Sequence, residues 1–345
     1  MRRLASAGVV AMLAAAVLTA AQDPQVFRGG GVTVAVPVTV FDRGGHVVSG
    51  LTKDDFTLYD EGTPQAISNF IESDEALTAV VLVDTSASMT MGLELAQFAA
   101  EQFVIRMRPG DRAKVGSFSD RLILSHTFTQ DRDALLHSIR NDLHIGNPTR
   151  LLDAVDSAVA TLAPERGRRI ILLLTDGCDT LSDTRWSRLL TRVRTEEVMI
   201  YAMQIRSHVR ILPEYRKRNP RDWDCVNLEE QFMTAPAIEK IGDIFEDARH
   251  ELLPDAVLER LTLETGGSRF FLSPDDNVNS IFTQFLEELR HVYLLGFVPG
   301  TLDDKLHELK VEVAGQRKDG RGRVVRARRS YLANKPGEAG GPTRR

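Results

Sequence analysis

The chain has 345 residues, of which 43% are hydrophobic and 26% are charged, and its formal net charge is −5 at pH 7. This composition belongs to a globular protein with room for two domains, and it excludes a disordered or fibrous chain. The net acidity gives no sign of nucleic-acid binding. A basic cluster at residues 317–329 fits a surface strand or hairpin better than a patch for a polyanion.

The first residues have the three parts of a secretory signal. Met1, Arg2 and Arg3 form a charged start, an Ala-rich apolar run follows, and small residues precede Gln22. We expect cleavage after about Ala20 or Ala21, which makes residues 1–21 a signal peptide and the mature protein periplasmic or secreted. No other stretch is apolar enough to cross a bilayer, so we expect no membrane span after cleavage.

Residues 22–75 have the pattern of a small β module. Residues 32–51 read VTVAVPVTVFDRGGHVVSGL, in which apolar and polar residues alternate on both sides of a Gly-Gly turn. Residues 53–71 continue this pattern around a second turn at Asp60, Glu61 and Gly62. Alternation of this kind with glycine at the turns predicts β-hairpins.

Residues 78–89, TAVVLVDTSASM, contain the most informative motif of the chain. The apolar, β-branched run predicts a buried strand, and Asp84 stands at its carboxyl end, where open α/β sheets bind ligands. Asp84, Ser86 and Ser88 then offer one carboxylate and two hydroxyls at alternate positions. Oxygen donors without His or Cys favour a hard cation such as Mg²⁺, with Mn²⁺ and Ca²⁺ as alternatives.

Two later segments have the same character. Residues 146–155, GNPTRLLDAV, form a loop that leads into a helix and carries Thr149, and residues 168–177, RRIILLLTDG, form a second buried strand that ends at Asp176. Asp153, one turn into its helix, is expected to support the Thr149 loop and not to bind the ion. We expect further helices at about 92–107, 132–140, 151–162 and 182–195, and strands at 113–118, 121–128 and 197–205. This alternation predicts a parallel sheet flanked by helices.

Residues 206–253 interrupt that alternation with a long polar segment before a helix that begins near Pro254. Insertions of this length in a compact domain are usually either functional lids or flexible excursions. Because the segment leaves the carboxyl end of a strand, we expect it to shape the same face as Asp84 and Asp176.

Residues 292–333 return to a β pattern, with strand-like runs at 292–300, 307–315 and 321–333, and residues 334–345 have the composition of a disordered tail. Neither terminal β segment has enough strands to bury a sheet face alone. We therefore expect the two segments, 22–75 and 292–333, to form one β-sandwich into which the α/β domain of residues 76–291 is inserted.

These motifs, in this order and spacing, resemble the metal-ion-dependent adhesion site of von Willebrand factor type A domains. The resemblance covers about residues 76–290. The flanking segments Val40–Phe56 (V-x-D-x-x-G-x-x-V-x-G-L-x-x-x-D-F) and Tyr293–Phe297 (Y-x-L-G-F) are similar to those of exported bacterial proteins related to this family, well represented in acidobacteria. The fold that this implies is a Rossmann-like, mostly parallel sheet with helices on both faces.

The resemblance also implies a set of metal ligands. Asp84, Ser86 and Ser88 would come from the first loop, Thr149 from the second and Asp176 from the third. In the family one coordination position stays open and is usually filled by an acidic side chain of a partner protein. The alternative is that Ser86 and Ser88 only cap the following helix, but capping explains neither Thr149 nor Asp176.

The two cysteines, Cys178 and Cys225, matter in an oxidising compartment. A bridge between them would tether the insertion beside the metal face. The sequence does not show whether the two Cα atoms come within bonding range, so the bridged and free states both remain open.

Functionally, we expect a cation-dependent protein-binding module, used in adhesion or in assembly of an envelope complex, without enzymatic activity. Two alternatives are a scaffold whose metal only stabilises the fold and, less favoured, a metal-assisted hydrolase. No motif places a general base for a hydrolase, and the eight histidines are scattered without metal-ligand spacing. The sequence also contains no nucleophile elbow and no phosphate-binding P-loop.

Overall fold

The computed structural model describes residues 33–73, 75–205, 254–316 and 322–334. The expected signal peptide at 1–21, the insertion at 206–253 and residues 335–345 of the expected tail lie outside the described residues. No helix in the described ranges is long and apolar enough to cross a bilayer.

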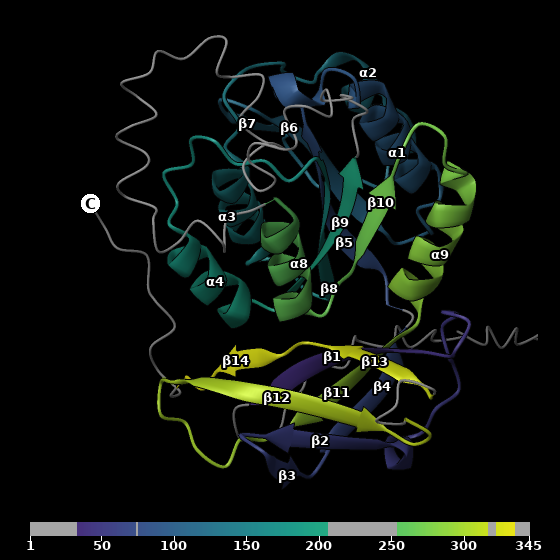
Figure 1. Cartoon of the computed structure of the whole chain (residues 1–345), viewed down its shortest axis with the longest axis vertical. Coiled ribbons are helices and arrows are strands. Elements are labelled where there is room, and N and C mark those ends of the chain that lie inside the picture. The colour runs from purple at the N-terminus through teal and green to yellow at the C-terminus, as the bar shows by residue number, and fades with distance from the viewer. Residues whose placement is uncertain (1–32, 74, 206–253, 317–321, 335–345) are drawn as a thin grey trace, which may run out of the picture. The chain divides into compact units, whose positions relative to one another are not determined.

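A six-stranded sheet forms the centre of the α/β domain (Figure 1). All neighbouring strands run parallel except the last pair, in which β7 is antiparallel to β6. In spatial order the strands are β10 (Arg269–Leu272), β9 (Val198–Ile205), β8 (Arg168–Thr175), β5 (Leu77–Asp84), β6 (Arg112–Phe118) and β7 (Leu122–Leu124).

Helices cover both faces of this sheet (Figure 1). One face packs against α1 (Leu93–Ile105), α2 (Arg132–Asn141) and α9 (Val278–Arg290). The other packs against α3 (Leu151–Leu162), α4 (Trp186–Thr195) and α8 (Pro254–Thr265). Successive side chains of β5 enter the two layers in turn, and every residue of the strand is buried. This is why the strand is a continuous apolar run and not an alternating one.

The terminal segments form two four-stranded antiparallel sheets. Both sheets contain strands from each end of the chain, since β1 pairs with β11 and β2 pairs with β12. One sheet has the order β13 (Val324–Ala327), β1 (Val34–Phe41), β11 (Val292–Phe297) and β4 (Asn69–Ser73). The other has the order β14 (Ser330–Leu332), β12 (Leu306–Val313), β2 (Phe56–Asp60) and β3 (Thr63–Gln65).

Apolar side chains from both sheets share one core, which includes Val36, Val38, Leu58, Leu295 and Val311. The hairpin predicted around Asp60–Gly62 is present, with Asp60 opposite Thr63. The fold class predicted from the sequence is therefore confirmed, both for the parallel α/β sheet and for the sandwich built from the two ends of the chain.

Buried polar contacts join the two parts. Glu264, near the end of α8, accepts two hydrogen bonds of 3.0 Å from the Arg194 guanidinium and one of 2.7 Å from the Ser330 hydroxyl of β14. Glu288 of α9 accepts one of 2.8 Å from Arg326 of β13. Arg328 donates to the Arg194 carbonyl. Two arginines of the C-terminal basic cluster, Arg326 and Arg328, therefore hold the sandwich to the α/β domain.

Two elements differ from their predicted bounds. The strand predicted at 121–128 is regular only over Leu122–Leu124, although Ser125 and Thr129 still bond backbone groups of β6. The helix predicted from residue 182 begins at Trp186, because the preceding residues are held in a loop by Asp153, which accepts from the N–H groups of Asp183 and Thr184.

Candidate metal site

The first loop of the site begins at Asp84, the last residue of β5, whose side chain is fully buried. The Ser86 hydroxyl donates to Asp84 Oδ1 at 2.6 Å, and the Ser86 N–H donates to the same oxygen at 3.0 Å. The Ser86 and Ser88 hydroxyl oxygens are 3.1 Å apart. The three side chains therefore form a continuous row of oxygen atoms.

The capping alternative for Ser86 does not describe this geometry. Ser86 occupies the N-cap position of the short 3-10 helix η2 (Ala87–Met89), but its side chain makes no capping hydrogen bond. The N-cap of α1 is Gly92. The Ser86 hydroxyl is directed to Asp84 and Ser88 instead.

The third loop supplies a second carboxylate. Asp176 follows β8 directly, and its Oδ1 accepts from the Cys178 N–H at 3.0 Å. Thr175, the last residue of β8, donates its hydroxyl to Asp84 Oδ2 at 2.6 Å. Because β5 and β8 are parallel neighbours with Val83 opposite Leu174, the two strand ends lie side by side at the carboxyl edge of the sheet.

The second loop is bonded to both of the others. The Gly146 N–H donates to the Thr85 carbonyl at 3.4 Å, and the Thr149 carbonyl accepts from the Thr180 N–H at 3.0 Å. The Thr180 hydroxyl accepts from the Thr149 N–H at 2.9 Å. Within the described part of the chain the Thr149 hydroxyl has no hydrogen-bond partner, which leaves its oxygen free for a ligand.

The electrostatics of the site favour a cation. Burial, together with the charge of nearby Asp176, raises the pKa of Asp84 to about 7. Two carboxylates that repel each other in a buried place are costly as a bare pair, and a positive ion would lower the cost of ionising both. Burial also raises the pKa of Asp179, which accepts hydrogen bonds from Ser182 and from the backbone of Leu152.

The donor set fits a hard divalent ion. The gathered groups are carboxylate and hydroxyl oxygens, the ligands that Mg²⁺, Mn²⁺ and Ca²⁺ take. The described residues contain no group of three His, Cys, Asp or Glu side chains able to hold a metal. A zinc-type centre of imidazoles and thiolates does not fit these residues.

Sequence reasoning missed several supporting residues. Thr175 and Thr180 form hydrogen bonds with the predicted ligands Asp84 and Thr149, and Asp179 accepts a hydrogen bond from the Leu152 N–H at the start of α3. The sequence gives only a weak indication of these three residues, because Thr and Asp are common in loops and do not by themselves indicate a contact with a predicted ligand. Only the pairing of β5 with β8 brings Thr175 to Asp84.

Cys178 lies in the third loop, where it is buried and disulfide-bonded. Cys225, the other cysteine of the chain, lies outside the described residues. The bond fixes the backbone two residues after Asp176, so it constrains the loop that carries the second carboxylate.

Residues 79–178 match the family model for the von Willebrand factor type A domain. The chain contains a von Willebrand factor type A domain. The matched residues include Asp84, Ser86, Ser88, Thr149 and Asp176, which are the five positions that the sequence resemblance assigned to the metal. No curated protein matches the chain.

Three solved structures are similar to part of this chain. An aerotolerance-related membrane protein from Bacteroides fragilis is 16% identical over 62% of this chain and 98% of its own, with a TM-score of 0.42. BatB from Bacteroides thetaiotaomicron is 14% identical over 61% and 97%, also at 0.42. Proximal thread matrix protein 1 from the mussel byssus, described with a zinc-occupied MIDAS motif, is 14% identical over 66% of this chain and 49% of its own, at 0.43.

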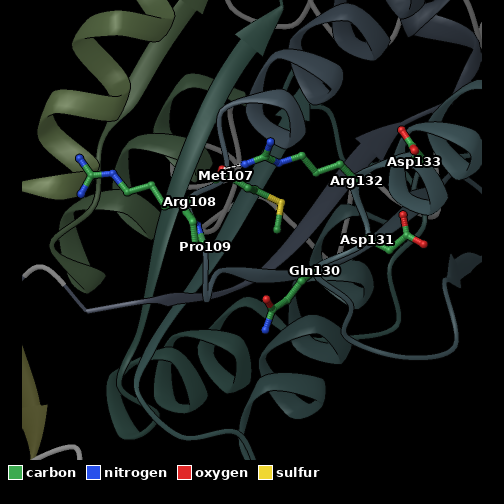
Figure 2. Close-up of a pocket in the computed structure, with 7 residues that line it drawn as sticks. All are labelled: Met107, Arg108, Pro109, Gln130, Asp131, Arg132 and Asp133. Atoms are coloured by element: carbon green, nitrogen blue, oxygen red, sulfur yellow. Dashed lines mark hydrogen bonds between the residues drawn. The ribbon is translucent and has the colours of Figure 1, made fainter. Parts of the chain in front are cut away.

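A separate pocket of about 410 Å³ lies beside residues 107–109, which precede β6 (Figure 2). It is lined by Met107, Arg108, Pro109 and residues 130–133, and the Arg132 guanidinium donates to the Met107 carbonyl beside it. Because β6 begins at the amino edge of the parallel sheet, this pocket is not part of the candidate metal site.

Proposed function

We propose that this protein binds a divalent cation through Asp84, Ser86, Ser88, Thr149 and Asp176, and uses it to bind a carboxylate of a partner protein. The observation that carries the proposal is the row of oxygens from Asp84 through Ser86 to Ser88, completed by a second carboxylate close enough to raise the pKa of Asp84. Mg²⁺ is the expected ion, with Mn²⁺ and Ca²⁺ as alternatives.

Some residues of the proposed site supply negative charge, and others hold the Asp84 carboxylate in position. Asp84 and Asp176 supply two negative charges, while the three hydroxyls are neutral, so a bound divalent ion would keep an affinity for a further anionic oxygen. Thr175 fixes one oxygen of Asp84 and Ser86 fixes the other, so the carboxylate cannot rotate freely. Such preorganisation lowers the entropy cost of binding.

We further propose that the protein acts outside the cytoplasm, in adhesion or in assembly of an envelope complex, and that it has no catalytic activity. The expected signal at residues 1–21 supports export. A hydrolase would need a general base placed against an open metal position, and no side chain of the predicted ligand set has that role.

The test is calorimetric titration of Mg²⁺, Mn²⁺, Ca²⁺ and Zn²⁺ into residues 22–345. We expect saturable binding of a hard ion, weakened at least about tenfold in Ser86→Ala and in Asp176→Asn, because each change removes one ligand or one charge. Ser187→Ala, an exposed serine of α4, is the matched control and should bind as the wild type does.

The same protein samples also distinguish a metal that binds a partner from a metal that only stabilises the fold. If the metal only holds the fold together, EDTA will unfold the wild-type protein; if it serves binding, the circular dichroism spectrum will be retained in EDTA. Failure of all four ions to bind, or binding that survives both substitutions, would contradict the proposed site.

A further inference from the structure

Arg168, the first residue of β8, carries a buried guanidinium that has no hydrogen-bond partner in the described part of the chain. All three of its guanidinium nitrogens are inaccessible to solvent, and none of them donates a hydrogen bond to a described residue. The hydroxyl of Tyr201 in β9 is buried and unpartnered in the same way. Buried polar groups in folded proteins almost always have a partner, so these two groups need an explanation.

The two side chains extend into the same layer of the α/β domain, the one covered by α9 (Figure 1). Residues of β8 alternate between the two faces of the sheet, and Ile170 and Leu172 lie in this layer, so Arg168 starts on the same face. Tyr201 lies opposite Leu172 on the neighbouring strand, with its ring 5.5 Å from that of Phe285 in α9. Burial raises the pKa of Tyr201 and the Arg168 charge opposes this rise, so the two groups are close in space.

Two other arginines act on this pair of groups, and each of them has a carboxylate partner. Arg290 donates to both oxygens of Asp111, and Arg326 donates to Glu288 at 2.8 Å. Both carboxylates are buried. Three arginine charges therefore meet two buried carboxylates, and the charge left over is that of Arg168.

Neither the protonation of Arg168 nor its other neighbours remove this imbalance. Burial lowers the pKa of Arg168, but an arginine stays protonated in proteins, so the charge persists. Glu75 attracts this charge without forming a hydrogen bond to the guanidinium, and burial keeps the Tyr201 hydroxyl neutral. A buried charge without a partner is strongly destabilising, and an anion from solution that accepts hydrogen bonds from both groups would remove that cost.

We propose that Arg168 and Tyr201 bind a chloride ion from solution between β8, β9 and α9. The guanidinium supplies the positive charge and up to three donor nitrogens, and the Tyr201 hydroxyl donates one further hydrogen bond. This site belongs to the layer beneath α9 and does not depend on the proposed metal-dependent function.

The surroundings favour a small monovalent anion over other occupants. One negative charge balances the one arginine charge that has no carboxylate. The neighbouring side chains of this layer, among them Ile170 and Phe285, are apolar and buried, so a multiply charged and strongly hydrated anion such as phosphate would cost more to transfer from water. A water molecule would accept the same hydrogen bonds but leave the Arg168 charge unbalanced.

Bromide, a heavier halide that scatters X-rays anomalously, tests the site directly. In crystals of residues 22–345 grown in sodium bromide, we expect an anomalous peak in contact with the Arg168 guanidinium and Tyr201 Oη. Crystals of Arg168→Met grown in the same way should lack this peak, because the substitution removes the charge and the donors.

Urea unfolding measures the effect of the ion in solution. The unfolding midpoint of the wild type should rise as chloride replaces gluconate at constant ionic strength, because chloride binds the folded protein and not the unfolded chain. In Arg168→Met the midpoint should not depend on chloride. In Tyr201→Phe the chloride concentration that gives half of the effect should rise at least about tenfold, since one hydrogen bond to a charged group is lost.

Arg169→Met is the matched control, because it removes the same charge from the adjacent residue. Arg169 starts on the opposite face of the sheet, where its guanidinium donates to the Ala163 carbonyl at 3.3 Å and lies 3.8 Å from Glu196. This variant should keep the chloride dependence of the wild type.

Several results would overturn the chloride site. One is a chloride dependence that survives in Arg168→Met or disappears equally in Arg169→Met. Another is a wild-type crystal without the anomalous peak, in which a water molecule, Glu75 or Glu288 is the partner of Arg168. If Arg168→Met does not fold, the bromide crystals of the wild type and the chloride dependence of Tyr201→Phe still decide the question.

Discussion

His307 in the sandwich lies between two carboxylates. Its Nδ1 is 3.0 Å from Asp60 Oδ1 and its Nε2 is 3.1 Å from Asp303 Oδ1, while Tyr331 donates its hydroxyl to Asp60 Oδ2 at 3.0 Å. Burial alone would lower the pKa of His307, but the two carboxylates outweigh it and the pKa is raised above its ordinary 6.5. Both ring nitrogens donate only when the ring is protonated.

This arrangement predicts a pH-dependent contribution to stability. Because the pKa of His307 is higher in the folded state, the contribution is fully present below about pH 6.5 and is lost as the pH rises through the raised value. Urea unfolding should therefore show that His307→Gln costs more stability at pH 6 than at pH 9. A His307→Gln cost independent of pH would contradict the charge assignment.

At the level of single residues, the sequence pattern singles out the predicted ligands but not the residues that hydrogen-bond to them. Asp84, Ser86 and Ser88 are readable because they follow one another after an apolar strand, and the structure joins them by hydrogen bonds. Thr175 was not predicted because its contact with Asp84 depends on which strands are neighbours. That choice is made by packing of the whole sheet, and no local pattern encodes it.

The connection between α8 and β10 depends on a glycine. A Cβ added at Gly267 would collide with the backbone carbonyl of Ile200 in β9, a group that cannot rotate away. Because Gly267 has no side chain, its backbone can lie against that of Ile200, and the chain can pass from α8 into the edge strand β10. Gly300, by contrast, has nothing within 4 Å of its added Cβ.

We therefore expect Gly267→Ala to lower the free energy of unfolding by at least about 2 kcal/mol, the cost of overpacking a site that cannot relax. Gly300→Ala should change it by less than about 0.5 kcal/mol. Urea denaturation followed by circular dichroism measures both. Equal effects for the two glycines would show that the β9 backbone can move aside.

Among the elements, those with strong periodicity were predicted closely. The helices at α2 and α3 and the strands β5, β8 and β9 lie within one residue or so of their expected bounds, because apolar runs and amphipathic spacing are local signals. The start of α4 was placed too early, since residues near 182 have acceptable helix propensity but are bonded to Asp153 and Asp179 in a loop. Tertiary hydrogen bonds override propensity there.

In the whole molecule, Glu264 links the α/β domain to the sandwich. Its side chain is only 5% exposed and accepts from Arg194 and from Ser330, while Arg260 Nε lies 2.8 Å from it. Glu264→Ala would remove both hydrogen bonds that the Arg194 guanidinium donates to Glu264, and would leave the largely buried Arg194 charge without this carboxylate. A broken buried pair typically costs about 3–5 kcal/mol.

We expect Glu264→Ala to lower the melting temperature and to separate the unfolding of the sandwich from that of the α/β domain in scanning calorimetry. Glu312→Ala, which removes an exposed partner of Lys310, should cost less than about 1 kcal/mol and keep the wild-type profile. An unchanged profile for Glu264→Ala would mean that the other contacts between the two parts, such as Arg326 with Glu288, are enough to couple their unfolding.

The pairing of Val34 with Phe297 sets the order in which the protein can be completed during synthesis. All strands of the α/β sheet lie between these two residues, so that sheet can form while β1 still lacks β11. At roughly 5–20 residues per second, the wait is on the order of ten seconds to a minute. During that time β1 is an open strand edge that could pair with another chain. That edge of β1 closes only when β11, near the end of the chain, has been made.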